Sequence, residues 1–122
     1  MKKNILPEQT QEAYSVTDEK VEQAIKSLID TYNPIFIYAF GSYARGTYDE
    51  GSDFDVMVVI DQYDDKPWKV MAHGRSQLAD ILMPIDLLVY DQDKFEACKN
   101  DITSFCHTIL KKGKLLYERK SS

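Results

Sequence analysis

The chain has 122 residues, 43% of them hydrophobic, which suffices for one hydrophobic core and predicts a single domain over residues 1–122. Fifteen Lys and Arg against twenty Asp and Glu give a net charge of −5, which argues against direct nucleic-acid binding. No apolar signal region or membrane span is recognisable, so we expect a cytoplasmic protein without a membrane partner. The two cysteines, Cys98 and Cys106, lack metal-ligand spacing, and we expect them to be reduced and to serve packing.

An amphipathic helix is the first predicted element, after a polar and flexible lead-in over residues 1–14. Ser15–Asp18 has the form of a capping box at its start. Apolar residues then recur on one helical face until Asn33 and Pro34 end the pattern: Val21, Ala24, Ile25, Leu28, Ile29 and Tyr32.

Two buried strands follow this helix. The apolar run Ile35–Phe40 predicts the first, which ends at Gly41, and residues 42–46 are expected to form a single helical turn. Phe54–Ile60 predicts the second strand, and its only charged residue is Asp55.

A second amphipathic helix is predicted after an acidic loop. Asp65 is the expected cap, Pro67 lies in the first turn, and Pro84 ends the pattern. Its apolar face comprises Val70, Met71, Leu78, Ile81 and Leu82. Ile85–Tyr90 then predicts a third buried strand.

The remaining residues predict two helices and an edge strand. Asp91 or Asp93 would cap a short helix, and Gly113 would end a longer one. Leu115–Tyr117 predicts the edge strand. The longer helix would have on one face Ile102, Phe105, Cys106, Ile109 and Leu110. Alternating helices and strands predict an α/β fold, a two-layer sandwich with a small mixed sheet and helices on one face.

Three aspartates are predicted to meet at one end of this sheet. Asp53 and Asp55 point the same way because strand side chains alternate with period two. Asp86 lies one residue into the third strand, which a right-handed crossover would place parallel to the second. For Gly41 and Ser42 to reach the same end, the first strand must run antiparallel to the second.

The chemistry of this predicted site favours a metal and a phosphate. Converging carboxylates repel one another unless a cation neutralises them, and Mg²⁺ prefers carboxylate, water and phosphate oxygens. The turn at Gly41 and Ser42 would offer backbone N–H groups and a hydroxyl to an anion. Arg45 is placed to supply positive charge to a triphosphate. Two magnesium ions would form the clamp used in nucleotidyl transfer.

These residues form a recognisable signature. A Gly-Ser pair, ten further residues, an Asp-x-Asp pair and one later aspartate resemble the DNA polymerase beta type nucleotidyltransferase superfamily; the residues are Gly41, Ser42, Asp53, Asp55 and Asp86. The Gly-Ser-Tyr-Ala-Arg-Gly form of the turn and the one-domain length resemble, more narrowly, its minimal nucleotidyltransferases (MNT). The similarity extends over residues 20–118.

The resemblance implies the nucleotidyltransferase fold and a role for each motif residue. Asp53 and Asp55 would carry the magnesium ions, while Asp86 would complete the second metal site and help to deprotonate the acceptor hydroxyl. Gly41 and Ser42 would hold the nucleotide phosphates. Many minimal members act as the antitoxin of a helical HEPN ribonuclease toxin, and some transfer AMP from ATP to a tyrosine of that partner. The implied donor is therefore ATP, and the implied partner is a HEPN protein. A homo- or hetero-oligomer is also expected.

Several alternatives stay open at the level of sequence. Asp53 alone could cap a turn, Arg45 could form a structural salt bridge, and Tyr43 and Tyr48 could either pack or contact a ligand. The acidic loop around Asp61 is better explained as a solvated turn. A binding-only antitoxin and a small-molecule nucleotidyltransferase of the antibiotic-modifying kind remain alternative functions.

Overall fold

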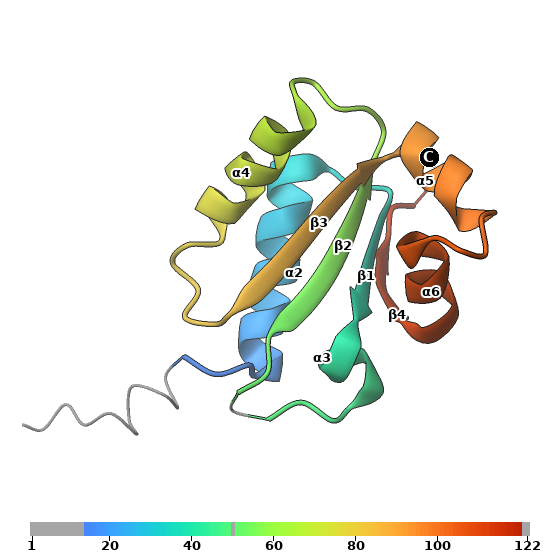
Figure 1. The fold of residues 1–122 in the computed structure, drawn as a ribbon. Coiled ribbons are helices and arrows are strands. Elements are labelled where there is room, and N and C mark those ends of the chain that lie inside the picture. Colours follow the sequence, from blue (N-terminus) through green and yellow to red (C-terminus); the bar gives the residue numbers. More distant parts are fainter. Residues whose placement is uncertain (1–13, 50, 121–122) are drawn as a thin grey trace, which may run out of the picture.

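A four-stranded mixed sheet organises the protein (Figure 1). The computed structural model describes residues 14–49 and 51–120, so residues 1–13 of the predicted lead-in over 1–14 lie outside the described residues. The elements are α2 (Asp18–Tyr32), β1 (Phe36–Phe40), α3 (Gly41–Arg45), β2 (Phe54–Ile60), α4 (Pro67–Gln77), β3 (Ile85–Asp91), α5 (Gln92–Lys99), α6 (Phe105–Lys112) and β4 (Lys114–Glu118). None of the helices in this part of the chain is long and apolar enough to cross a membrane.

The strand directions follow the prediction. The sheet order is β3-β2-β1-β4, in which β1 is antiparallel to both of its neighbours and β2 is parallel to β3. The register pairs Phe40 with Asp55 and Asp55 with Asp86. The end of β1 therefore meets the starts of β2 and β3 at one end of the sheet.

Helices cover both faces of the sheet, which corrects the expectation of helices on one face. Figure 1 shows α2 and α4 on one side of the strands and α5 and α6 on the other. On the first side the buried cluster includes Leu28, Val56 and Val58, and on the second it includes Met57 and Val59. Because β2 is buried on both faces, its residues other than Asp55 are apolar without alternation. The predicted α/β fold class with a mixed sheet is nevertheless confirmed.

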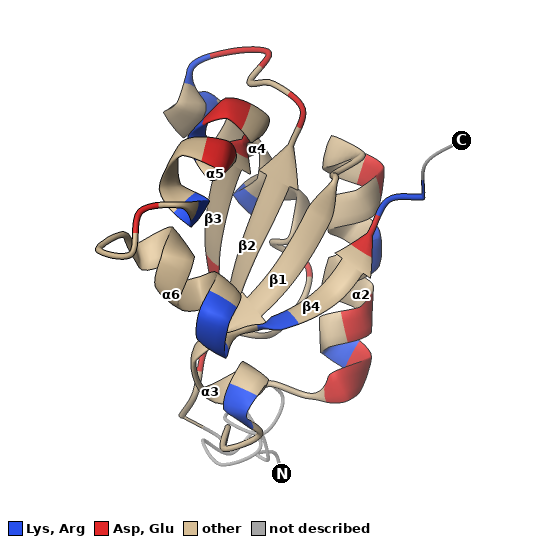
Figure 2. Cartoon of the chain, turned by 90° about the vertical axis from the view of Figure 1, so that its right-hand side faces the viewer, with Lys and Arg blue, Asp and Glu red and all other residues tan. Residues whose placement is uncertain are grey.

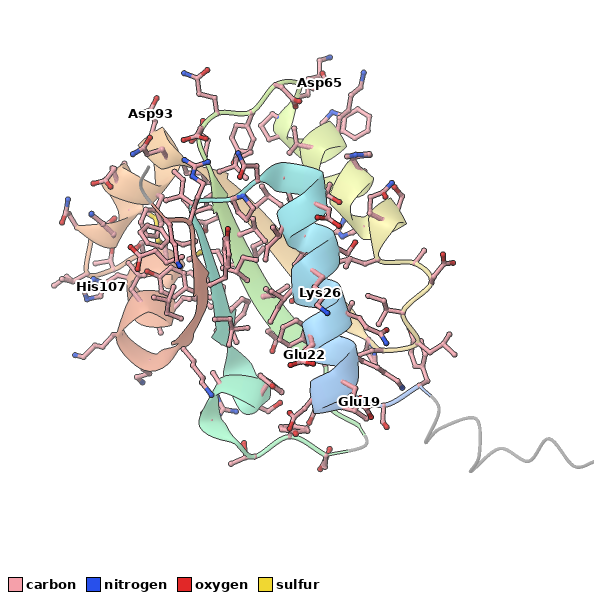
Figure 3. All side chains as sticks on the ribbon, turned by 180° about the vertical axis from the view of Figure 1, so that it is seen from behind. Glu19, Glu22, Lys26, Asp65, Asp93 and His107 are labelled. Carbon is pink, nitrogen blue, oxygen red and sulfur yellow. A yellow bond between two sulfur atoms is a disulfide. The ribbon has the colours of Figure 1, made fainter. Side chains whose placement is uncertain are left out.

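Helix α2 is the long amphipathic helix predicted from the apolar spacing. Its N-cap is Thr17, whose hydroxyl oxygen accepts a hydrogen bond from the Lys20 N–H at 3.2 Å. Figure 3 shows that Glu19, Glu22 and Lys26 point away from the sheet. The polar face is thus solvated while the apolar face packs on the strands.

Three helix boundaries differ from the prediction. Helix α4 is capped by Lys66 instead of Asp65, and it ends at Gln77. The backbone then continues in turns, in which the Ile81 N–H donates to the Leu78 carbonyl. Helix α6 starts only at Phe105, because the Ser104 hydroxyl caps it. The apolar spacing continued through these turns and made both helices look longer.

The cysteines also correct the sequence prediction. Cys98 on α5 and Cys106 on α6 form a disulfide, with their Cα atoms 5.9 Å apart. The two short helices lie against each other, which brings together two cysteines that were expected to be reduced. Cys106 is also buried in the cluster on this face, so the expected packing role is present as well.

Candidate functional site

The predicted site residues meet where β1 ends and where β2 and β3 begin. Phe40 leads directly into α3, and its partner in the sheet is Asp55. Asp86 lies beside Asp55 on the other side. Alternation places both aspartates on the face of the sheet that α5 and α6 partly cover.

Asp55 is the most constrained of the three aspartates. It is half-buried at the start of a strand whose other residues are all buried. Burial raises the pKa of its carboxyl above the ordinary value of 3.8, and the charges of Asp86 and Asp53 raise it further. The positive charge of Arg45 opposes this shift. The charges of the other three predicted residues therefore all act on the Asp55 carboxyl.

Gly41 brings the backbone of α3 against Asp55. Its φ of +69° lies in the left-handed region, and a Cβ at this position would overlap the Oδ2 of Asp55. Ser42 is half-buried in the same turn, and its carbonyl accepts a hydrogen bond from the Thr47 N–H at 3.0 Å. Only glycine permits this close approach of turn and carboxylate.

Asp53, Asp86 and Arg45 remain exposed at this end of the sheet. Asp49, not Asp53, stabilises the turn before β2, because its carboxylate accepts hydrogen bonds from the Gly51 N–H and the Ser52 hydroxyl. Within residues 14–49 and 51–120, Arg45 forms no ion pair. The structural alternatives for Asp53 and Arg45 therefore have no support in the described residues.

The donor set fits a hard cation in part. Carboxylate oxygens are the preferred ligands of Mg²⁺, and a nearby cation would relieve the repulsion that raises the pKa of Asp55. The described part of the chain nevertheless holds no group of three His, Cys, Asp or Glu side chains close enough to bind a metal together. Substrate phosphates and water are the usual additional ligands of Mg²⁺ at such sites.

Two tyrosines, one in α3 and one just after it, form hydrogen bonds to the first turn of α2. The hydroxyls of Tyr43 and Tyr48 both donate to Asp18 Oδ1, at 3.1 and 3.2 Å. Their rings lie 5.0 Å apart, and Tyr43 packs edge-on against Phe54 at 5.3 Å. Burial, reinforced by the Asp18 hydrogen bond, raises the pKa of Tyr43 to about 12. The sequence pattern assigned Asp18 only to the start of the helix, and its hydrogen bonds to the two tyrosines depend on tertiary contacts.

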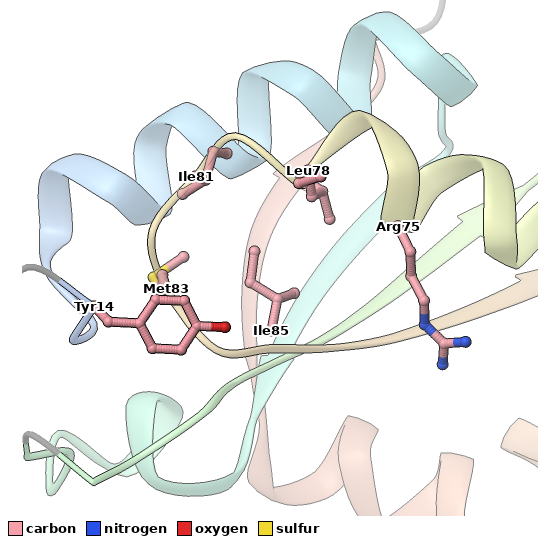
Figure 4. A pocket seen from close by; sticks show the side chains of 7 residues that line it. Tyr14, Arg75, Leu78, Ile81, Met83 and Ile85 are labelled. Atoms are coloured by element: carbon pink, nitrogen blue, oxygen red, sulfur yellow. The ribbon is translucent and has the colours of Figure 1, made fainter. Parts of the chain in front are cut away.

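Two cavities lie near this end of the sheet, on opposite faces. One of about 210 Å³ lies between α3 and α6 and is lined in part by Gly41, Arg45 and Phe105. The other, of about 220 Å³, lies where α4 turns into β3 (Figure 4). Its lining includes Tyr14 and Arg75 but none of the three aspartates, so it does not belong to the predicted site.

Basic residues also gather at this end. The end of α6 and the start of β4 carry Lys111, Lys112 and Lys114, and Figure 2 shows these basic segments close to α3 and its Arg45. A cationic edge thus lies beside the carboxylates in a chain whose net charge is −5.

The comparison with protein families agrees with this geometry. The family described as "Polymerase beta, Nucleotidyltransferase" matches residues 22–122. The chain therefore belongs to the polymerase beta type nucleotidyltransferase family, as its Gly-Ser and Asp-x-Asp motifs predicted. No curated protein matches it.

Solved structures show the same fold. A candidate nucleotidyltransferase from Sulfolobus solfataricus is 19% identical with a TM-score of 0.57, and the match covers 98% of this chain and 93% of the other. A further candidate nucleotidyltransferase is 20% identical with a TM-score of 0.53, covering 80% and 97% of the two chains. A toxin–antitoxin with AMP-PNP is 26% identical with a TM-score of 0.50, covering 84% and 74%.

Proposed function

We propose that this protein is a magnesium-dependent nucleotidyltransferase that transfers AMP from ATP to a hydroxyl group. The observation that carries the proposal is the register that aligns Phe40, Asp55 and Asp86, since it brings the Gly41 turn and the carboxylates together. Membership of the nucleotidyltransferase family supports it. The similarity to a toxin–antitoxin with AMP-PNP supports an adenine nucleotide as the donor.

The proposed roles follow from the position of each residue. Asp53 and Asp55 would hold Mg²⁺, and Asp86 would contribute to the second metal position and accept the proton of the acceptor hydroxyl. Bound Mg²⁺ would supply charge neutralisation at the phosphates and at the attacking oxygen. Gly41 and Ser42 would bind the phosphates through N–H and hydroxyl groups, and Arg45 would balance their charge.

The proposed acceptor is a tyrosine of a HEPN-type toxin, for which this chain would be the cytoplasmic antitoxin. The similarity to a toxin–antitoxin supports this assignment, as does the resemblance of the motif to minimal nucleotidyltransferases. We further propose that residues 1–122 act as a single nucleotidyltransferase domain.

The direct test is transfer of labelled AMP to the co-purified partner. The chain and a HEPN protein that co-purifies with it are incubated with ATP and Mg²⁺, and the partner is analysed by intact mass. We expect the mass of one or more AMP groups on the partner with the wild-type chain and none with Asp53→Asn. No added mass with the folded wild-type chain at any Mg²⁺ concentration would contradict the proposal.

The same preparation separates transfer from binding. Asp53→Asn keeps the shape of the side chain and is exposed, so the variant is expected to fold and still bind the partner. If this variant neutralises the toxin as well as the wild type does, the chain is a binding-only antitoxin. If the chain transfers AMP from ATP to a small-molecule acceptor in the absence of any partner, with release of pyrophosphate, it is a small-molecule nucleotidyltransferase.

A further inference from the structure

The cavity between α3 and α6 adjoins the proposed phosphate site. Its volume is about 210 Å³, and Gly41 and Arg45 of the turn form part of its wall. Phe105, Ile109 and Lys112 of α6 also line it. A ligand bound at the Gly41 turn could therefore extend directly into this cavity.

The lining of the cavity is suited to a flat aromatic group. Phe105 leaves 54% of its surface exposed, although it meets Phe40 edge-on with ring centroids 5.4 Å apart. A ring that enters the cavity can stack on this exposed face, as bases do on aromatic side chains. The cations at the rim, Arg45 and Lys112, can approach the ring or the phosphate attached to it.

We propose, on the basis of the proposed function, that this cavity binds the base of the donor purine nucleoside triphosphate. A cavity of about 210 Å³ is smaller than the roughly 300–1,000 Å³ of sites for whole drug-sized ligands. It therefore accommodates one ring system, while the phosphates lie outside it at Gly41. Phe105 and Thr108 on α6 are then the residues that determine nucleotide specificity.

The sheet order separates this subsite from the acceptor. Asp86 lies on β3, on one side of Asp55, whereas β1 and the cavity lie on the other. An acceptor hydroxyl at Asp86 and a base beside Gly41 would therefore not compete for space. Inorganic phosphate alone would leave the apolar wall of Phe40, Phe105 and Ile109 without a partner.

Binding measurements can test the subsite independently of transfer. ATP and inorganic tripolyphosphate are titrated by calorimetry in Mg²⁺, using the wild type, Phe105→Ala and Thr108→Trp, which fills the cavity. We expect both variants to bind ATP about five- to tenfold more weakly than the wild type and tripolyphosphate equally well. Ile102→Ala is the control, because Ile102 is 77% exposed just before α6 and does not line the cavity.

Three results would overturn the inference. If the variants bind ATP and tripolyphosphate equally more weakly than the wild type, the cavity binds phosphate. If they bind ATP unchanged but transfer AMP more slowly, the cavity binds the acceptor. Wild-type protein that binds neither ligand would overturn both this inference and the proposed function. ATP binding that depends on Phe105 without any AMP transfer would support the subsite and contradict the proposed function alone.

Discussion

The two faces of the sheet are built from helices of different length. Helix α2 has 15 residues and is about 22 Å long, nearly the length of about 23 Å expected for the seven residues of β2. Helix α6 on the other face has eight residues and is about 12 Å long. Two helices of eight residues each, α5 and α6, share the other face, where the start of β2 is less covered and Asp55 is half-buried.

The candidate site lies on the less covered face of the sheet. Val56 and Val58 point to the covered side and are fully buried, while Asp55 points to the open end and remains half-buried. A carboxylate in the middle of β2 would be trapped without solvent or cation, at a high cost in free energy. The same strand thus provides both the core and the candidate site.

Substituting the aspartates at the start of β2 should reduce AMP transfer more than any other change. Asp53→Asn and Asp55→Asn should each lower AMP transfer at least about 100-fold, because they remove proposed metal ligands. Asp61→Asn is the matched control at the opposite end of β2, where Asp61 pairs with Arg119 at 3.0 Å. Rates from intact-mass time courses give the result. Equal losses in all three variants would contradict a specific role of the start of β2 in transfer.

Core truncation tests whether the two faces fold as one unit. Leu28→Ala on the α2 side and Met57→Ala on the α6 side each remove a side chain that is at most 1% exposed. Each should lower the free energy of unfolding by about 2–5 kcal/mol in a single urea transition. Two separate transitions for Met57→Ala would show that α5 and α6 unfold independently.

Substituting the glycines at the two ends of α3 distinguishes backbone strain from steric overlap. Gly41 and Gly46 both have positive φ, but only at Gly41 would a Cβ meet Asp55. Gly46→Ala should lower the free energy of unfolding by about 1–2 kcal/mol, and Gly41→Ala should lower it further and abolish nucleotide binding. Thermal unfolding and ATP titration measure the two effects. Equal results for both variants would contradict the proposed contact.

Removing the hydrogen bond between Tyr43 and Asp18 should have a smaller effect on stability and ATP binding. Tyr43→Phe removes the hydrogen bond to Asp18 while keeping the contact with Phe54, and should lower the free energy of unfolding by about 0.5 kcal/mol. It should also weaken ATP binding two- to threefold, roughly the factor that this energy represents. Unchanged ATP binding with reduced stability would show that this hydrogen bond stabilises the fold without affecting the nucleotide site.

The smallest expected effect concerns pH. Because the pKa of Asp55 is raised in the folded protein, folding favours its protonated form. Its stabilising contribution is complete below the ordinary value of 3.8 and is lost as the pH rises through the raised folded pKa. The wild type should therefore lose stability relative to Asp55→Asn as the pH rises above the ordinary value of 3.8, as urea titrations would show. A constant difference would contradict the raised pKa.

The strands and the meeting of the site residues could be predicted from sequence. Buried strands have continuous apolar runs, so Phe54–Ile60 was found with its observed bounds. The antiparallel direction of β1 followed from requiring Gly41 and Asp55 to meet, and the register confirms it. Such constraints are local in sequence or follow from chain topology.

The rest depended on tertiary contacts that no pattern contains. Apolar spacing does not reveal which side of a sheet a helix covers, so all helices were expected on one face, whereas α5 and α6 lie opposite α2 and α4. The pairing of Cys98 with Cys106 required the packing of two helices. Gly74 in α4 is needed because a Cβ there would overlap the Tyr32 hydroxyl, which bonds to the Val70 carbonyl.

The central claim is that the carboxylates and the Gly41 turn form one site for a metal-bound nucleotide. Calorimetric titration of ATP into the wild type and into Asp53→Asn, with Mg²⁺ and with a chelator, tests it most directly. We predict that Mg²⁺ tightens ATP binding to the wild type at least about tenfold and has no such effect on Asp53→Asn. Equal affinity of the wild type with and without Mg²⁺ would contradict the account.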